Sequence, residues 1–356
     1  MAIMNKSVLV AISGGVDSSL AAWLLKKQGY EVTGVFLDFW KEKNKKNKSC
    51  SITSKSEAKK VAKQLKINFL VFDFCQIFKK LVVDNYINQQ LIGQTPNPCI
   101  RCNKFVKLGH LLDRAKDLGF DYLATGHYIR LKWLKNSWHV YQARDKTKDQ
   151  SYFLYNLSQP KLNHLLFPLG PYTKSEVRIM AKKVGLRVHN RPDSQDICFI
   201  SDNDMIGFLG RNSKRIKAGQ IINNQGQVVG THRGLPYYTI GQRTGLGIGG
   251  QAGPYYVIDK NVKKNKLVVT NNKKSSQLWQ SNLVVKNLNW ISDQKPKFPQ
   301  KLAAKIRYLS KPEPAVITKV KNQTEVQFNK PIRAITPGQS VVFYKNKELL
   351  GGGIIT

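Results

Sequence analysis

Acidic residues are scarce in this sequence. Asp and Glu together number 22 in 356 residues, against 58 Lys and Arg, which gives a formal net charge of +36. Such an excess predicts that the molecule attracts polyanions and releases them as salt rises. We therefore expect a nucleic acid partner, although a solvated surface of lysines with no partner is the alternative that charge alone leaves open.

Long hydrophobic runs are also lacking at the start of the chain. The apolar run at residues 8–12 is too short for the hydrophobic region of a signal peptide or for a membrane-spanning helix. We expect a cytoplasmic protein with no membrane partner.

Cysteine is rare as well. The five cysteines are Cys50, Cys75, Cys99, Cys102 and Cys198. An odd, small number in a long chain fits a reducing compartment, where thiols catalyse or bind metals more often than they form structural disulfides.

Strand and helix patterns alternate through the first half of the chain. Apolar runs at 7–13, 31–39, 67–74 and 122–126 predict strands, and segments at 18–27, 55–65 and 104–118 predict helices. This rhythm indicates an α/β domain with a doubly wound parallel sheet, whose ligands bind beyond the carboxyl ends of the strands. We expect this domain to span residues 1–205.

The pattern changes after about residue 205. Gly, Asn and short β-rich runs predict a small central β-rich domain at 206–282. Alternating runs at 301–308, 315–320, 325–328 and 339–344 predict a C-terminal β-barrel at 283–356. The fold class is therefore α/β followed by two small, mainly β domains.

A glycine-rich loop, SGGVDSS at residues 13–19, connects the first predicted strand to the first helix. Glycines let the backbone approach a phosphate, and the start of a helix offers unsatisfied N–H groups. The loop lacks the Gly-Lys-Ser/Thr ending of a Walker loop, which favours cleavage between the α- and β-phosphates of ATP. Asp17 beside phosphates implies Mg²⁺. An ordinary strand-to-helix turn is the alternative.

Cys99 and Cys102 form a Cys-x-x-Cys pair just before the predicted helix at 104–118. Because they lie at a helix N-terminus beside Arg101 and Lys104, we expect a thiol whose pKa is lowered toward the reactive thiolate. Cys198 lies far along the chain, in DSQDICFI.

Two other uses of these cysteines remain open. Half a zinc site is one, although no second pair at ligand spacing is visible, and a thioredoxin-type dithiol is the other. Cys50 and Cys75 are interpreted as thiols without a function.

Six motifs together resemble one family. In chain order they are SGGVDSS, TPNPCIRCNKFVKLG, ATGHY, KDQSYFL, DSQDICFI and YTIGQRTGLGIGG. From about residue 7 to the end, the chain is similar to the tRNA-specific 2-thiouridylases of bacteria and organelles. The resemblance implies an ATP-pyrophosphatase (PP-loop) domain that adenylates O2 of the wobble uridine in lysine, glutamate and glutamine tRNAs. Sulfur then replaces the activated oxygen.

The resemblance also assigns roles to the cysteines. Cys102 matches the nucleophile, and Cys198 matches the cysteine that carries a persulfide supplied by a cysteine desulfurase or a sulfur-relay protein. A persulfide on one cysteine can attack the activated carbon, or release hydrosulfide when the other cysteine resolves it. A transient disulfide between Cys102 and Cys198 is implied in either case.

Ligand contacts follow from the same resemblance. Those expected for ATP are Ala11, Ile12, Ser13, Gly14, Gly15, Val16, Asp17, Ser18, Leu37 and Gly126. Those expected for tRNA are Asn97, Pro98, Cys99, His127, Lys148, Asp149, Gln150, Arg307, Tyr308 and Gln339. Arginine suits phosphate and tyrosine can stack on an extruded base, whereas a solvated strand edge is the alternative for the last three residues.

Cys99 departs from the family pattern, because many members carry Asp at this position. The change puts a proton-transfer role there in doubt. It also permits a second hypothesis, in which Cys99, Cys102 and Cys198 hold three irons of a [4Fe–4S] cluster.

Three rival functions remain. Amidotransferase-type synthetases for GMP or NAD share the loop but explain neither the two cysteines nor the charge. tRNA lysidine synthetases share the loop and substrate class but need no cysteine, and a non-catalytic tRNA-binding protein would not need the loop. We expect a monomer.

Overall fold

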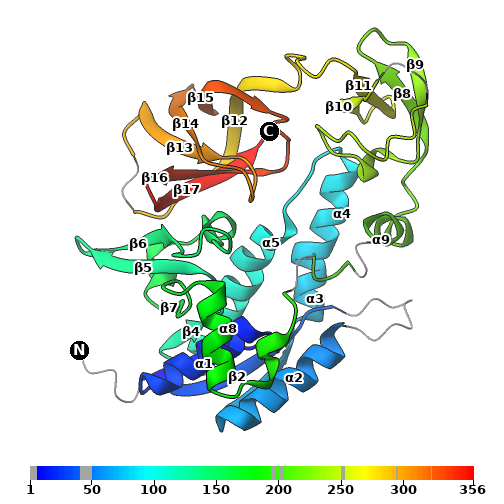
Figure 1. Cartoon of the computed structure of the whole chain (residues 1–356). Coiled ribbons are helices and arrows are strands. Elements are labelled where there is room, and N and C mark those ends of the chain that lie inside the picture. The colour runs from blue at the N-terminus through cyan, green and yellow to red at the C-terminus, as the bar shows by residue number, and fades with distance from the viewer. Residues whose placement is uncertain are drawn as a thin grey trace.

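The computed structural model describes residues 6–40, 50–193, 197–200, 204–249, 253–293, 296–321 and 323–356. Residues 194–196 of the DSQDICFI motif lie outside this set, as does the side chain of Cys50. Figure 1 shows the N-terminal α/β part at the bottom of the view, the C-terminal barrel at the upper left and the central β part at the upper right. Among the described residues, no helix is both long and apolar enough to cross a membrane.

A parallel five-stranded sheet organises the first part. Its strands, in spatial order, are β3 (Asn68–Asp73), β2 (Glu31–Asp38), β1 (Ser7–Ala11), β4 (Tyr122–Ala124) and β7 (Leu165–Leu166). The chain proceeds from β1 to β2 on one side and returns to β4 on the other. The carboxyl end of β1 is therefore the topological switch point, where ligands bind in such sheets.

Helical segments cover both faces of this sheet. One face carries α1 (Val16–Lys27), α2 (Cys50–Leu65), α8 (Lys174–Lys183) and η4 (Arg187–Asn190). The other carries α3 (Cys75–Phe78), the π-helix η1 (Lys79–Val83), α4 (Asp84–Leu91), α5 (Pro98–Arg101), the π-helix η2 (Cys102–His110) and α6 (Leu111–Asp117). In β1, Val8 and Val10 face the first layer and Leu9 the second, as the period of a strand requires. The predicted doubly wound α/β class is confirmed.

The single helix predicted at 104–118 is wrong. The helical stretch begins at Pro98, because the Asn97 side chain accepts hydrogen bonds from the backbone N–H groups of Cys99 (3.1 Å) and Ile100 (3.3 Å). It then widens into η2 before α6 continues it. Gly109 permits the wide turn, because a Cβ there would lie 2.9 Å from the carbonyl oxygen of Lys104.

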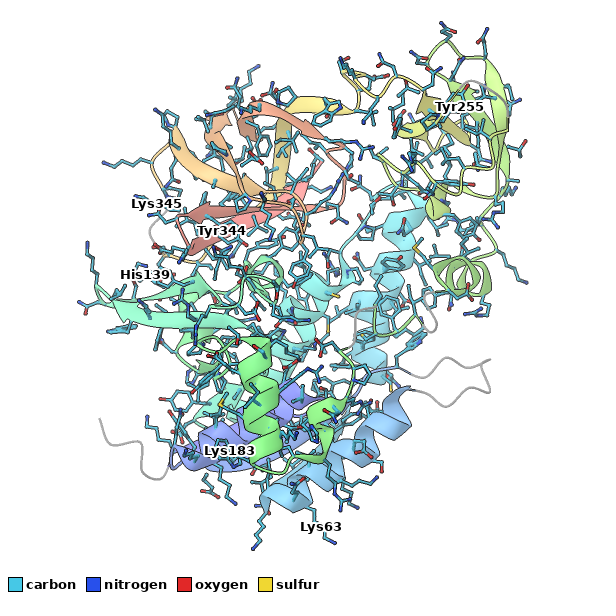
Figure 2. The ribbon with its side chains drawn as sticks, viewed as in Figure 1. Lys63, His139, Lys183, Tyr255, Tyr344 and Lys345 are labelled. Atoms are coloured by element: carbon cyan, nitrogen blue, oxygen red, sulfur yellow. The ribbon has the colours of Figure 1, made fainter. Side chains whose placement is uncertain are left out.

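A hairpin that the sequence reading missed joins the first part to the barrel. It consists of β5 (Ile129–Leu134) and β6 (Ser137–Gln142), with Lys135 and Asn136 at positive φ in a two-residue turn. β6 pairs with β17 (Glu348–Ile355), and His139 Nδ1 lies 2.6 Å from Glu348 Oε1. Figure 2 shows His139 just below Lys345 and Tyr344 at this junction.

Short helical segments lie around this junction and before the central part. They are η3 (Ser151–Leu154), α7 (Gln159–Leu162) and α9 (Met205–Asn212).

Two small β structures complete the chain. The central sheet has the order β10 (Tyr256–Asn261), β11 (Lys266–Thr270), β8 (Gly219–Asn223) and β9 (Val228–His232), with η6 (Leu235–Tyr237) beside it. The C-terminal strands are β12 (Trp279–Trp290), β15 (Gln323–Arg333), β14 (Glu313–Val320), β13 (Gln300–Lys305), β16 (Ser340–Lys345) and β17. Pairing of β12 with β17 closes the barrel, which confirms the predicted C-terminal β-barrel.

Candidate active site

The phosphate loop lies at the switch point of the parallel sheet. α1 starts at Val16 without a side-chain cap, so its first N–H groups remain available to an anion. Gly14 has φ +75°, and a Cβ there would lie 2.7 Å from the carbonyl oxygen of Ser54. The backbone of this loop therefore fits the phosphates of ATP.

The expected adenine contacts lie on the two strands that flank β1. Leu37 is near the end of β2, and Gly126 follows β4. A Cβ on Gly126 would lie 2.8 Å from the backbone nitrogen of Ser18, so glycine allows this segment to reach the start of α1. Ile12 continues from β1 and donates its N–H to the carbonyl of Val35 at 2.8 Å.

Asp17 stands at the start of α1 as the expected partner of Mg²⁺. Its carboxylate accepts hydrogen bonds from Lys174 Nζ at 2.7 Å and from the Tyr128 hydroxyl at 2.7 Å. Burial, followed by the charge of Asp17, raises the pKa of Tyr128, so the phenol stays a donor. A part-exposed carboxylate next to the phosphate loop has the oxygen donors that Mg²⁺ prefers.

Two neighbouring cysteines and a third from far along the sequence lie in one region of the fold. We call Cys99, Cys102 and Cys198 the thiol site. Cys102 is 5% exposed at the start of η2, and Cys99 and Cys198 are exposed. The charges of Cys99 and Cys198 both act on Cys102, so both lie within electrostatic reach of it.

The expected lowering of the cysteine pKa is wrong for the thiol site. Burial raises the pKa of Cys102 to about 12. The two cations that the sequence placed beside them point elsewhere. Arg101 donates to the carbonyl of Leu81 at 2.8 Å, and both Arg101 and Lys104 lie over the ring of Phe105.

Lys107 is the cation that the sequence reading missed. Its positive charge lowers the pKa of Cys102 and so partly offsets the effect of burial. Burial would lower the pKa of Lys107 itself, but the charges of Cys102, Cys198 and Cys99 outweigh burial and raise it. Residues five apart on an α-helix point about 140° from each other. A π-helix instead joins residues five apart by its hydrogen bonds, so η2 places Lys107 on the side of Cys102.

His127 connects the thiol site to the nucleotide site. Burial, and then the charge of Lys107, lowers the pKa of His127 to about 3, so the ring is neutral at physiological pH. Its Nδ1 lies 2.8 Å from the hydroxyl of Thr125. Because His127 directly follows Gly126, one short segment both approaches the start of α1 and lies within the electrostatic reach of Lys107.

Besides His127, the residues of the α/β part that are expected to contact tRNA lie in two segments, 97–99 and 148–150. Asn97, Pro98 and Cys99 form the start of α5, at the thiol site. Lys148 forms an ion pair with Asp193 at 2.7 Å. Asp149 is 5% exposed and accepts from the Ser151 hydroxyl at 2.7 Å, and Gln150 accepts from the backbone of Tyr128 at 2.9 Å, so both side chains hold the fold together here.

The other three residues expected to contact tRNA, which are Arg307, Tyr308 and Gln339, lie in the C-terminal barrel part. Tyr308 packs on Phe153, with ring centroids 4.4 Å apart, directly after the segment 148–150. Gln339 donates to the carbonyl of Thr95 at 2.7 Å, just before α5. Arg307 donates to the carbonyl of Ala334.

The three cysteines do not meet the geometry of a metal site. Within residues 6–40, 50–193, 197–200 and the later described segments, no group of three or more His, Cys, Asp or Glu side chains is arranged to hold a metal ion. The iron–sulfur hypothesis therefore has no support from this arrangement, and no step below depends on it.

Comparison with known proteins places this site in a family. Residues 6–202 match the family model described as "tRNA methyl transferase HUP domain". Residues 207–271 match "tRNA methyl transferase PRC-barrel domain", and residues 280–355 match "Aminomethyltransferase beta-barrel domain". The chain is 46% identical over 361 residues to the tRNA-specific 2-thiouridylase MnmA 2 of Clostridium tetani, covering 100% of both chains.

The chain belongs to the tRNA-specific 2-thiouridylase family. It is also 45% identical to the MnmA protein of Clostridium kluyveri, over 99% of both chains. The MnmA protein of Carboxydothermus hydrogenoformans is 44% identical, over 99% of this chain and 98% of its own. The 2-thiouridylase family resemblance inferred from the motifs is thereby confirmed.

Proposed function

We propose that the protein is a tRNA-uridine 2-sulfurtransferase that uses ATP to replace O2 of the wobble uridine in lysine, glutamate and glutamine tRNAs with sulfur. One observation carries the proposal. The segment containing Gly126 and His127 approaches the start of α1 at Gly126 and lies within the electrostatic reach of Lys107 at His127. Activation by ATP and transfer of sulfur therefore take place at adjoining positions.

The first step joins ATP to the uridine. O2 of the base attacks the α-phosphorus, the bond to the β-phosphate breaks, and pyrophosphate leaves. The phosphate loop binds the departing pyrophosphate through the N–H groups at the start of α1. Mg²⁺, held by Asp17 and the phosphates, would neutralise charge on the leaving group.

The second step transfers sulfur. A cysteine desulfurase or relay protein first places a persulfide on Cys198, and its terminal sulfur attacks C2 and expels AMP. The thiolate of Cys102 then attacks the Sγ of Cys198, which breaks the S–S bond to the base and leaves a thiocarbonyl. Cys102 and Cys198 become a disulfide, and an external dithiol must reduce it before the next turnover.

The residues around the thiol site support these steps. Lys107 places positive charge where the persulfide and the Cys102 thiolate are negative. His127 is neutral, so it adds no competing charge, and its ring can donate a hydrogen bond to the base or accept one from it.

The base must leave the anticodon stack to reach this site. Positive charge over the whole chain favours binding of the tRNA backbone. The barrel lies beside the thiol site through Gln339, which donates to Thr95 next to α5. We infer that the barrel holds the stem while the α/β part receives the base.

A thiolation assay tests the proposal directly. Purified protein with unmodified lysine tRNA, ATP, Mg²⁺, a cysteine desulfurase with L-cysteine, and an external dithiol should form one AMP and one pyrophosphate for each 2-thiouridine. Thiolated tRNA is measured by its retardation on a mercury-containing gel. Formation of ADP and phosphate, or thiolation without ATP, would contradict the adenylation step.

The same purified protein distinguishes the persulfide route from the cluster-dependent route. We expect full activity in protein that metal analysis shows to be free of iron. Activity that appears only after iron and sulfide are restored under anaerobic conditions would replace the persulfide route by a cluster-dependent one.

A further inference from the structure

An arginine from a distant part of the chain lies against the phosphate loop. Arg191 Nη1 donates to the carbonyl oxygen of Gly14 at 2.8 Å, and Nη2 donates to the Ser54 hydroxyl at 3.2 Å. Gly14 and Arg191 are 177 positions apart in the sequence. The fold therefore places a guanidinium beside the residue that directly precedes Gly15, the N-cap of α1.

The backbone that carries Arg191 is held by the neighbouring helix α8. Arg178 of this helix donates to the carbonyl of His189 at 2.7 Å and to the carbonyl of Arg191 at 3.1 Å. The N–H of Arg191 donates to the carbonyl of Val188 in η4 at 3.1 Å. Arg191 therefore reaches the loop from a backbone that is fixed on its other side.

Other cations near the loop already face carboxylates. Lys174 Nζ lies 2.7 Å from the carboxylate of Asp17 and 2.9 Å from that of Asp193. Lys148 lies 2.7 Å and Arg178 2.8 Å from the same Asp193 carboxylate. Each of these three cations thus has an anionic partner inside the protein.

Arg191 differs from these cations because its hydrogen-bond partners are neutral. Within the part of the chain that the structure describes, its guanidinium donates to a carbonyl and to a hydroxyl only. The hydrogen bond from Lys60 and, with a smaller effect, the charge of Arg191 lower the pKa of Glu57 on α2, but Glu57 is paired with Lys60 at 2.7 Å. A guanidinium has five N–H donors, so Arg191 keeps both positive charge and donors for a further acceptor.

The phosphate loop needs such a cation, because it lacks the lysine of a Walker loop. We propose that Arg191 binds the β- and γ-phosphates of ATP and stabilises the pyrophosphate as it leaves. The inference rests on the proposed binding of ATP at this loop. Phosphates on the N–H groups at the start of α1 lie one or two residues from Gly14, and neighbouring Cα atoms are about 3.8 Å apart. The planar guanidinium can then form two parallel hydrogen bonds to phosphate oxygens.

This position lets Arg191 act where charge develops in the first step. When the bond between the α- and β-phosphates breaks, its electron pair passes to the departing pyrophosphate. A fixed cation beside the β- and γ-phosphates stabilises that charge. AMP remains on the uridine and has no β-phosphate, so the later release of AMP breaks no contact with Arg191.

Nucleotide affinities measure this contact without any tRNA. Titration calorimetry compares AMP with α,β-methylene ATP, each with Mg²⁺, on the wild type, Arg191→Gln and Arg187→Gln. In Arg191→Gln the affinity for α,β-methylene ATP should fall roughly 10- to 100-fold, and that for AMP less than about twofold, because only the β- and γ-phosphates lose a charged partner. Arg187 is exposed on η4, so Arg187→Gln removes the same charge from the same segment and should leave both affinities unchanged.

A second measurement on the wild type covers the case in which Arg191→Gln does not fold. Phenylglyoxal modifies arginine side chains, and peptide mass spectrometry follows Arg191 and Arg187 separately. Saturating α,β-methylene ATP with Mg²⁺ should slow modification of Arg191 several-fold and leave Arg187 unaffected. AMP should protect neither.

The outcomes separate phosphate binding from support of the loop. Equal losses of affinity for AMP and α,β-methylene ATP in Arg191→Gln would mean that Arg191 only shapes the loop. Unchanged affinity for the analogue in Arg191→Gln, or no protection of Arg191 by an analogue that binds the wild type, would likewise overturn this assignment alone. Failure of the wild type to bind the analogue would overturn the proposed function and the assignment with it.

Discussion

Replacing either Cys102 or Cys198 with alanine should lower tRNA thiolation by at least about 10³-fold, a loss typical of removing a nucleophile. Cys198 carries the incoming sulfur, and Cys102 releases it from the base, so neither cysteine can replace the other. ATP and tRNA binding should change less than about twofold, because the phosphate loop and the basic surface are untouched. Mercury-gel retardation and equilibrium binding measure the two effects.

Cys75→Ala is the matched control for these variants. Cys75 is half-buried at the start of α3, where its Sγ donates to the carbonyl of Asp38 at 3.4 Å, and it has no part in the proposed sulfur transfer. Its thiolation rate should stay within about twofold of the wild type. If Cys198→Ala were to keep its activity, sulfur would not pass through this residue. A loss in Cys99→Ala as large as in the other two would favour a role for all three thiols.

Local patterns were sufficient to predict the α/β sheet and the phosphate loop. The β1 strand, the glycines at 14 and 15 and the start of α1 are neighbours in the sequence, and short continuous apolar runs identify buried strands. The structure begins α1 at Val16, two residues earlier than the pattern predicts. The roles of Cys102 and Cys198 were assigned from the family motifs, and the fold brings the two residues within electrostatic reach of each other.

The position of Lys107 and the pKa of Cys102 depend on packing, which the sequence pattern did not predict. Lys107 looks like any other lysine of a basic chain, and an α-helical pattern places it on a different face from Cys102. A signal was present in Gly109, since a glycine inside a predicted helix often has a packing reason. The pKa of Cys102 was misjudged for a related reason: proximity in sequence to Arg101 and Lys104 does not fix where those side chains point.

Lys107→Met should slow thiolation at neutral pH by about tenfold or more. Because burial raises the pKa of Cys102 to about 12, only a small fraction of Cys102 is thiolate at pH 7. Lys107 lowers this pKa, so its removal raises the pKa further and reduces the fraction of Cys102 that is thiolate. The pH profile of Cys102 alkylation by iodoacetamide should therefore move to higher pH.

Lys104→Met is the control, because Lys104 stands on the same helix but lies over the ring of Phe105. Its alkylation profile should match the wild type, and Lys107→Arg should restore most of the reactivity because it keeps the charge. The direction of the effect separates electrostatics from packing. If Lys107 merely filled space, its truncation would open the site and make the buried Cys102 react faster, which is the opposite of the slower reaction that a lost charge produces.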